Sequence, residues 1–171
     1  MMQDEHGIRE RLLPAVYELA LRLGADPGRR RSAVRLGQTG RMRQLGASRW
    51  MAFRAEQTIS LLRCAFNWRA RTWRARTGPA GLVSVCDALS EGEGRLDVRA
   101  LGFIPIGRAS SSPALIRGEL MRYLAELAWA PDAILLNAEL RWREGEPDTL
   151  VVGAGSGETA AEVVLSLDDK G

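Results

Sequence analysis

The stretch from Asp87 to Leu136 constrains the fold more than any other part of the chain, because its hydrophobic period changes from two residues to about 3.6. Between residues 95 and 101, apolar side chains alternate with charged ones, a pattern typical of a strand with one solvated face. The preceding segment Glu91–Gly94 predicts a hairpin turn that joins this strand to another over residues 82–89. This part of the chain is therefore expected to form antiparallel sheet.

A helix is predicted to follow over residues 113–130, with Ser112 as its N-cap and a proline at its first position. Its charged side chains Glu119, Arg122 and Glu126 are spaced three and four residues apart, so they are expected to form weak pairs on the face opposite the apolar one. The apolar face is predicted to hold the helix against the sheet, and consists of Leu115, Ile116, Leu120, Tyr123, Leu124, Leu127 and Ala128.

The whole chain is predicted to be one α+β domain, with an N-terminal helix and a curved, half-barrel-like antiparallel sheet packed on one long central helix. Residues 1–31 form the N-terminal helical segment and linker, and residues 32–171 form the sheet and the central helix. The end of the sequence reads as a hairpin turn with no returning strand, so we expect that the last strands are missing. Further strands are predicted from Val34 and over 50–60, 66–72, 138–143, 149–154 and 160–168.

Charge is distributed unevenly along the chain. Residues 1–78 carry 16 basic and 6 acidic side chains, whereas residues 79–171 carry 8 and 15. The simpler explanation is that the two halves neutralise each other through ion pairs between adjacent strands. Binding of nucleic acid or another anionic partner is the alternative.

Residues 68–77 repeat five residues in tandem, as WRARTWRART. Interleaved arginine and tryptophan suit a single-strand nucleic-acid binder, because rings stack on bases and guanidinium groups contact phosphates. An insertion of odd length also moves the second copy to the other face of a strand, unless a bulge restores the alternation. We favour a local duplication absorbed by such a bulge.

No catalytic residue set and no metal site is predicted. His6 is the only histidine, which excludes a histidine-cluster metal site and most catalytic triads. Cys64 and Cys86 are expected to be free and inert thiols. A carboxylate-based hydrolase would need two acids that converge in a cleft, and the unassigned acids are Glu56, Glu119 and Glu139.

The chain resembles an uncharacterised bacterial family, a domain of unknown function common in high-GC bacteria. The resemblance is carried by RWMAFRAEQTIS (49–60), FNWRAR (66–71), DALSEGEGRLDVRALGFIPI (87–106) and RGELMRYLAELAWAPDAIL (117–135). It implies no activity, substrate or cofactor. Relative to such members, this chain looks duplicated in its Trp-Arg-Ala-Arg element and shortened at its C-terminus. By fold analogy alone, the predicted shape is similar to the curved half-barrel of bacterial lipoprotein carriers.

The expected function is non-enzymatic binding of a small apolar ligand or a protein partner, without a cofactor. Candidate pocket residues are the aromatic side chains Trp50, Trp68, Tyr123 and Trp129. The first alternative is nucleic-acid or anion binding through the arginine-rich N-terminal half, with the candidates Arg69, Arg71, Arg74 and Arg76, and the second is the hydrolase. We also expect a cytoplasmic protein with no membrane span, and self-association through an unpaired sheet edge.

Overall fold

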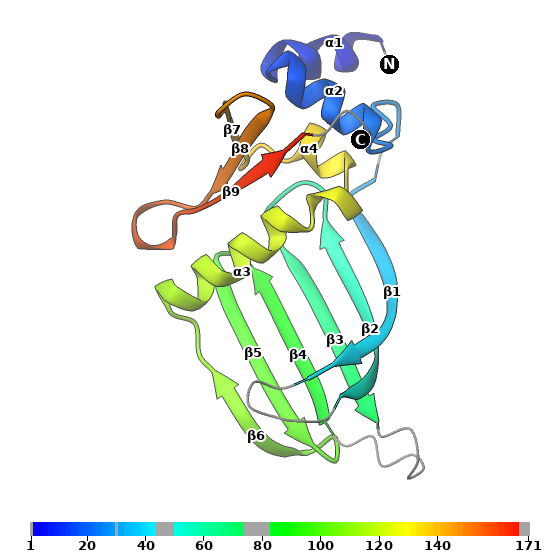
Figure 1. Ribbon diagram of the computed structural model, residues 1–171, viewed down its shortest axis with the longest axis vertical. Coiled ribbons are helices and arrows are strands. Elements are labelled where there is room, and N and C mark those ends of the chain that lie inside the picture. The colour runs from blue at the N-terminus through cyan, green and yellow to red at the C-terminus, as the bar shows by residue number, and fades with distance from the viewer. Residues whose placement is uncertain (1, 30, 44–49, 74–82, 168–171) are drawn as a thin grey trace.

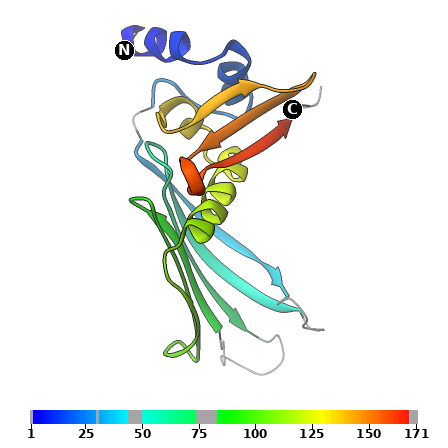
Figure 2. The ribbon, with the colours of Figure 1, turned by 90° about the vertical axis from the view of Figure 1, so that its left-hand side faces the viewer.

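The computed structural model describes residues 2–29, 31–43, 50–73 and 83–167. It contains two separate antiparallel sheets, one with six strands in the order β1-β2-β3-β4-β5-β6 and one with three in the order β7-β8-β9. The larger sheet is strongly curved, and helix α3 crosses its concave face near one end (Figures 1 and 2). The smaller sheet and the N-terminal helices gather at that same end.

The six-stranded sheet is a meander in which every strand pairs with its neighbour in sequence. Its alternating sequences place one set of side chains on the concave face and the other on the convex face. In β2, for example, Ala55, Gln57 and Ile59 are buried, whereas Arg54, Glu56 and Thr58 are exposed. The strands are β1 (Ala33–Met42), β2 (Met51–Ser60), β3 (Phe66–Trp73), β4 (Val83–Ser90), β5 (Glu93–Ala100) and β6 (Ile104–Ala109).

The remaining elements form the upper part of the molecule as it is drawn in Figure 1. Helix α3 begins with the predicted cap, since the Ser112 side chain accepts a hydrogen bond from the backbone nitrogen of Leu115. These elements are α1 (Met2–Arg11), α2 (Pro14–Arg22), α3 (Pro113–Ala125), the 3₁₀ turn η1 (Leu127–Trp129), α4 (Asp132–Leu136), β7 (Arg141–Glu144), β8 (Thr149–Ala154), the 3₁₀ turn η2 (Gly157–Thr159) and β9 (Ala161–Ser166).

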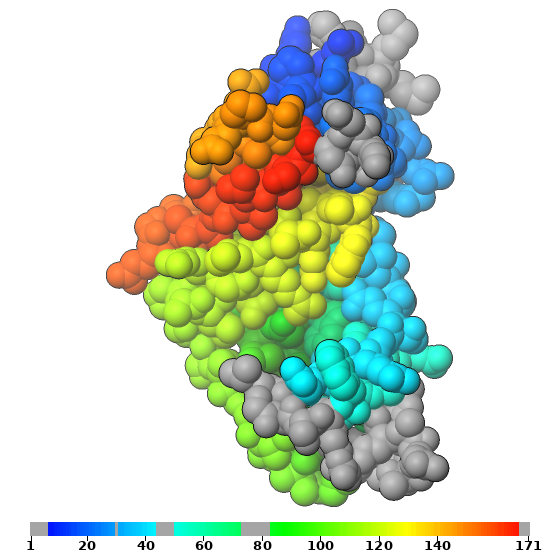
Figure 3. All heavy atoms as spheres, viewed as in Figure 1, coloured from blue at the N-terminus to red at the C-terminus, as the bar shows by residue number. Residues whose placement is uncertain are grey.

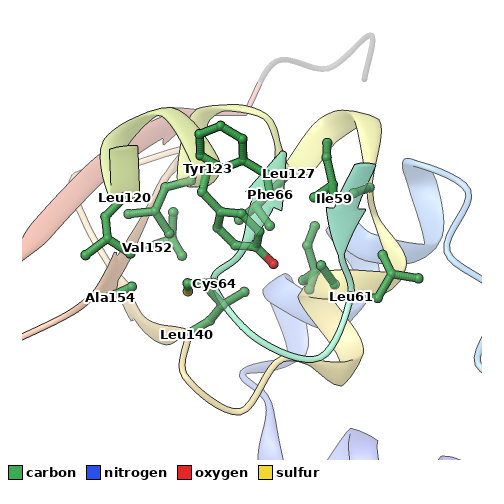
Figure 4. Close-up of a cluster of buried hydrophobic side chains, with 14 of the residues drawn as sticks. Ile59, Leu61, Cys64, Phe66, Leu120, Tyr123, Leu127, Leu140, Val152 and Ala154 are labelled. Carbon is green, nitrogen blue, oxygen red and sulfur yellow. The ribbon is translucent and has the colours of Figure 1, made fainter. Parts of the chain in front are cut away.

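The hydrophobic core lies where α3, the second sheet and the ends of β2 and β3 meet (Figure 4). Tyr123 lies at its centre and donates a hydrogen bond to the carbonyl oxygen of Ser60 at 2.9 Å. Leu120 of α3 packs beside Val152 and Ala154 of β8. The apolar face of α3 therefore contacts the second sheet and one end of the first, so α3 is enclosed on two sides.

The structure corrects several sequence predictions. The predicted helix over residues 113–130 ends at Ala125 and continues only as the 3₁₀ turn η1, so one long central helix is not confirmed. The single predicted sheet is divided into two, and strand β6 was not predicted. The largest correction concerns Glu119, Arg122 and Glu126, which were expected on a solvated face but point toward the concave sheet and are largely buried.

Both cysteines are free, as predicted. The predicted bulge in the Trp-Arg repeat depends on residues 74–77, which lie outside the described residues. In the ranges that the structure covers, no helix combines the length and the apolar character that a membrane crossing requires.

Candidate functional site

A polar row crosses the concave face of the larger sheet beneath α3. Gln57 of β2, Trp68 of β3 and Asp87 of β4 are directly opposite one another in register. All three are buried, although their neighbours on the same face of the same strands are apolar. Buried polar side chains need hydrogen-bond partners, and here α3 supplies those of Gln57 and Asp87, whereas Gln38 of β1 supplies that of Trp68.

Arg122 of α3 is the centre of these contacts. Its Nη1 donates to Oδ2 of Asp87, and its Nε donates to Oε1 of Glu126 at 2.9 Å. Its guanidinium plane also lies over two aromatic rings, 4.8 Å from the centroid of Phe66 and 5.1 Å from that of Trp68. Two carboxylates and two ring faces together compensate for the burial of this charge.

The contacts continue from Glu126 to the edge of the sheet. Gln57 Nε2 donates to Glu126 Oε2, and Gln38 Nε2 of β1 donates to Gln57 Oε1 at 2.7 Å. Trp68 Nε1 donates to Gln38 Oε1 at 2.8 Å. We call the connected set the Arg122 network, which consists of Gln38, Gln57, Trp68, Asp87, Glu119, Arg122 and Glu126.

Glu119 extends this network to a carboxyl pair. Burial, followed by a hydrogen bond and charge repulsion from Asp87, raises the pKa of Glu119 to about 7. Among the described residues, the buried Oδ1 of Asp87 has no other hydrogen-bond partner. A protonated Glu119 can donate a hydrogen bond to Oδ1 of Asp87. One proton held by this pair therefore accounts for the raised pKa of Glu119 and gives Oδ1 a partner.

Below the Arg122 network, the concave face is hollowed. The next two rows across the sheet contain apolar or small side chains on the same face as Gln57. Figure 3 shows a recess directly below α3, floored by the green middle strands. We call this recess the concave hollow, and its rows contain Phe53, Ala55, Ala70, Thr72, Val83, Val85, Val98 and Ala100.

The four predicted pocket residues do not lie together. Trp68 is buried in the Arg122 network and Tyr123 in the hydrophobic core. Trp50 and Trp129 are exposed on the surface, by 60% and 54%. Only Trp68 lies beside the concave hollow, through a tilted ring contact with Phe53 at 6.2 Å.

Two of the four predicted anion-binding residues lie in the described part of the chain. Arg69 and Arg71 lie on the convex face of β3, in a groove of about 970 Å³, whereas Arg74 and Arg76 lie outside the described residues. Every ion pair found in the described ranges joins side chains of the same half of the sequence. The expected neutralisation between the two halves is therefore not seen among these residues.

The unassigned acids point in different directions. Glu56 is exposed on the convex face, Glu119 belongs to the concave network, and Glu139 accepts a hydrogen bond from the backbone nitrogen of Cys64 at 2.7 Å. Burial raises the pKa of the Cys64 thiol to about 12, which makes it a poor nucleophile. Among the residues that the structure describes, no group of histidine, cysteine, aspartate and glutamate side chains could hold a metal ion.

The sequence contained a signal for the Arg122 network that its interpretation missed. Gln57 alternates with Ala55 and Ile59, and Asp87 alternates with Val85 and Leu89, so both occupy inward positions of otherwise apolar strands. A polar side chain at such a position predicts a buried partner. Nothing in the sequence indicated that the partner would be Arg122.

The fold and the site define a small α+β domain whose curved antiparallel sheet carries a buried charge network above an apolar hollow. The chain belongs to DUF6544, a family of unknown function whose model matches residues 15–171. Comparisons with curated proteins and with solved structures gave no significant match.

Proposed function

We propose that this domain binds a small ligand that has an apolar body and a polar end. The observation that carries the proposal is the concave hollow, which lies open below α3 in Figure 3. Ligand sites in proteins are typically concave and mostly apolar, with a few polar groups that fix the orientation of the ligand.

The side chains that line the concave hollow suit a ligand with a narrow apolar body. Val83, Val85, Val98 and Ala100 are half-buried although they are apolar, so a ligand would remove further apolar surface from water. Ala55 and Ala70 in the same rows are small and already buried, so the half-buried valines and Ala100 provide the apolar surface that a ligand can cover. Each buried methylene of the ligand would contribute about 0.8 kcal/mol.

The Arg122 network supports a polar end that points toward α3. Gln38 is half-buried at the boundary between the network and the hollow, and it both donates to Gln57 and accepts from Trp68. The remaining amide hydrogen of Gln38 is a suitable donor for a carboxylate or hydroxyl of the ligand.

Calorimetric titration with sodium decanoate, below its micelle concentration, tests this proposal. Val85→Trp fills the hollow and is expected to weaken binding at least tenfold, as is Val98→Trp at its register partner on β5. Ser84→Trp is the matched control, because it adds the same ring to the next residue on the convex face. Circular dichroism melts identify any variant that fails to fold.

Saturable binding that Val85→Trp and Val98→Trp weaken, and that Ser84→Trp leaves intact, supports the hollow as the site. The proposal is wrong if the unmodified protein binds no decanoate, or if the convex substitution weakens binding as much as the concave ones.

A further inference from the structure

Four large apolar side chains are exposed at the β5–β6 turn, which lies at the end of the sheet farthest from the smaller sheet (Figures 1 and 2). Phe103 is 71% exposed and Leu101 is 52% exposed. We call this set the apolar lip, and its members are Leu101, Phe103, Ile104 and Ile106. Contiguous exposed apolar groups of this kind mark interaction sites.

The backbone holds the apolar lip in a constrained turn. Leu101 has a φ of 53° and Gly102 has a φ of 79°, and the Phe103 nitrogen donates to the carbonyl oxygen of Ala100 at 3.2 Å. A left-handed conformation suits Gly or Asn and is strained for leucine. The chain therefore displays a leucine where folding alone favours a small or polar residue, which is typical of a functional position.

An arginine groove adjoins the lip on the convex face. Arg54 of β2 and Arg71 of β3 are directly opposite in register, and Ser84 separates Arg71 from Arg99 of β5. Like charges directly opposite each other destabilise a sheet. Within the described ranges, neither Arg54 nor Arg71 forms an ion pair, whereas Asp97 binds Arg99 at 3.0 Å.

The groove extends to the turn that carries the apolar lip. Gly102 of the β5–β6 turn lines the groove together with Arg54, Arg71 and Arg99. A basic surface beside an inserted apolar segment fits the boundary of an anionic bilayer, where phosphates lie next to acyl chains. None of the residues that line the groove is aromatic, which disfavours single-stranded nucleic acid, since its binders stack bases on rings.

We propose that this end of the six-stranded sheet docks on an anionic lipid surface. The apolar lip enters the acyl boundary, and Arg54 and Arg71, which form no ion pair within the described ranges, contact the headgroup phosphates. This contact goes beyond the ligand binding proposed above and does not depend on it, because vesicle binding needs no occupant in the concave hollow.

Co-sedimentation with vesicles tests the docking, using phosphatidylcholine alone and phosphatidylcholine mixed with phosphatidylglycerol. Leu101→Ser is expected to weaken partition onto the mixed vesicles about tenfold. Its matched control is Leu62→Ser, which removes an equally exposed leucine from the β2–β3 turn at the opposite end of the sheet.

A second pair of variants tests the arginine groove. Arg71→Gln is expected to weaken partition roughly fivefold and to reduce its salt dependence. Arg117→Gln, at an exposed position on α3 outside the groove, is its control. Partition that requires phosphatidylglycerol, falls with salt and is lost only in Leu101→Ser and Arg71→Gln supports docking.

Three results would overturn the proposal. They are absent binding to the mixed vesicles, equal binding to both vesicle types, and an equal loss in the control variants. Arg71-dependent retention of single-stranded DNA by a protein that ignores vesicles would identify nucleic acid as the partner, and would also refute the docking.

Discussion

The substitution Glu119→Gln tests whether the folded protein holds a proton between Asp87 and Glu119. The pKa of Glu119 is raised from 4.5 to about 7 by burial and by the adjacent Asp87. The folded state therefore keeps this proton over a pH range in which the unfolded chain releases it. The associated stabilisation is complete below pH 4.5 and is lost as the pH rises through about 7.

Glutamine resembles the protonated carboxyl group, because its amide can donate to the otherwise unpartnered Oδ1 of Asp87 at every pH. The variant and the unmodified protein should therefore differ little near pH 4. At pH 8 the variant should be the more stable of the two. The upper bound of this gain is about 3 kcal/mol, since each tenfold change in a proton-binding constant is worth about 1.4 kcal/mol.

Urea unfolding followed by circular dichroism, at intervals from pH 4 to pH 8, measures the difference in free energy of unfolding. Glu56→Gln, at an exposed position on the convex face, serves as the control and should show no such trend. A difference for Glu119→Gln that stays constant across this range, or that favours the unmodified protein at pH 8, would show that Glu119 is ionised in the folded state and refute the shared proton.

Three further predictions concern stability and reactivity. Tyr123→Phe should lower the free energy of unfolding by about 1–3 kcal/mol in denaturant titrations, because it removes the hydroxyl that accepts from Asn137 at 3.0 Å and leaves buried polar groups unsatisfied. Ser112→Ala should lower the free energy of unfolding by about 1 kcal/mol, because it removes the N-cap of α3. Ser112→Asp should retain most of this stability, because aspartate also caps helices. In a Cys86→Ser background, Cys64 should resist alkylation by iodoacetamide at pH 8 until urea is added. The reason is that burial raises the pKa of its thiol to about 12. Rapid alkylation of the native protein would show that the thiol is accessible.

Local sequence signals predicted several elements closely. The strand over residues 149–154 was predicted with its observed bounds, and the turn at Glu91 and Gly92 has the positive φ values that a tight hairpin requires. Strand β6 was missed because Pro105 and Gly107 weaken a strand pattern. Pro105 is tolerated in β6 because this is an edge strand with an adjacent bulge.

The candidate site was much less accessible to sequence reasoning. Arg122 and Asp87 are 35 residues apart, and their contact depends on how α3 crosses the sheet. The helical period correctly separated an apolar face from a charged one, and the usual inference that the charged face is solvated was wrong. The second sheet covers the apolar face, which leaves the charged face to meet the concave side of the first sheet.

Interactions between neighbouring residues were sufficient to predict the alternating strands, the capped start of α3 and the hairpin turns. Such features follow from backbone preferences and side-chain periods, which act over a few residues. Only the tertiary structure shows that the strands form two sheets, that Arg122 is buried among two carboxylates and two rings, and that Arg54 and Arg71 line a groove on the convex face. These outcomes depend on which apolar surfaces bury one another from water. Segments from the whole chain compete for these contacts, so a short stretch of sequence does not decide them.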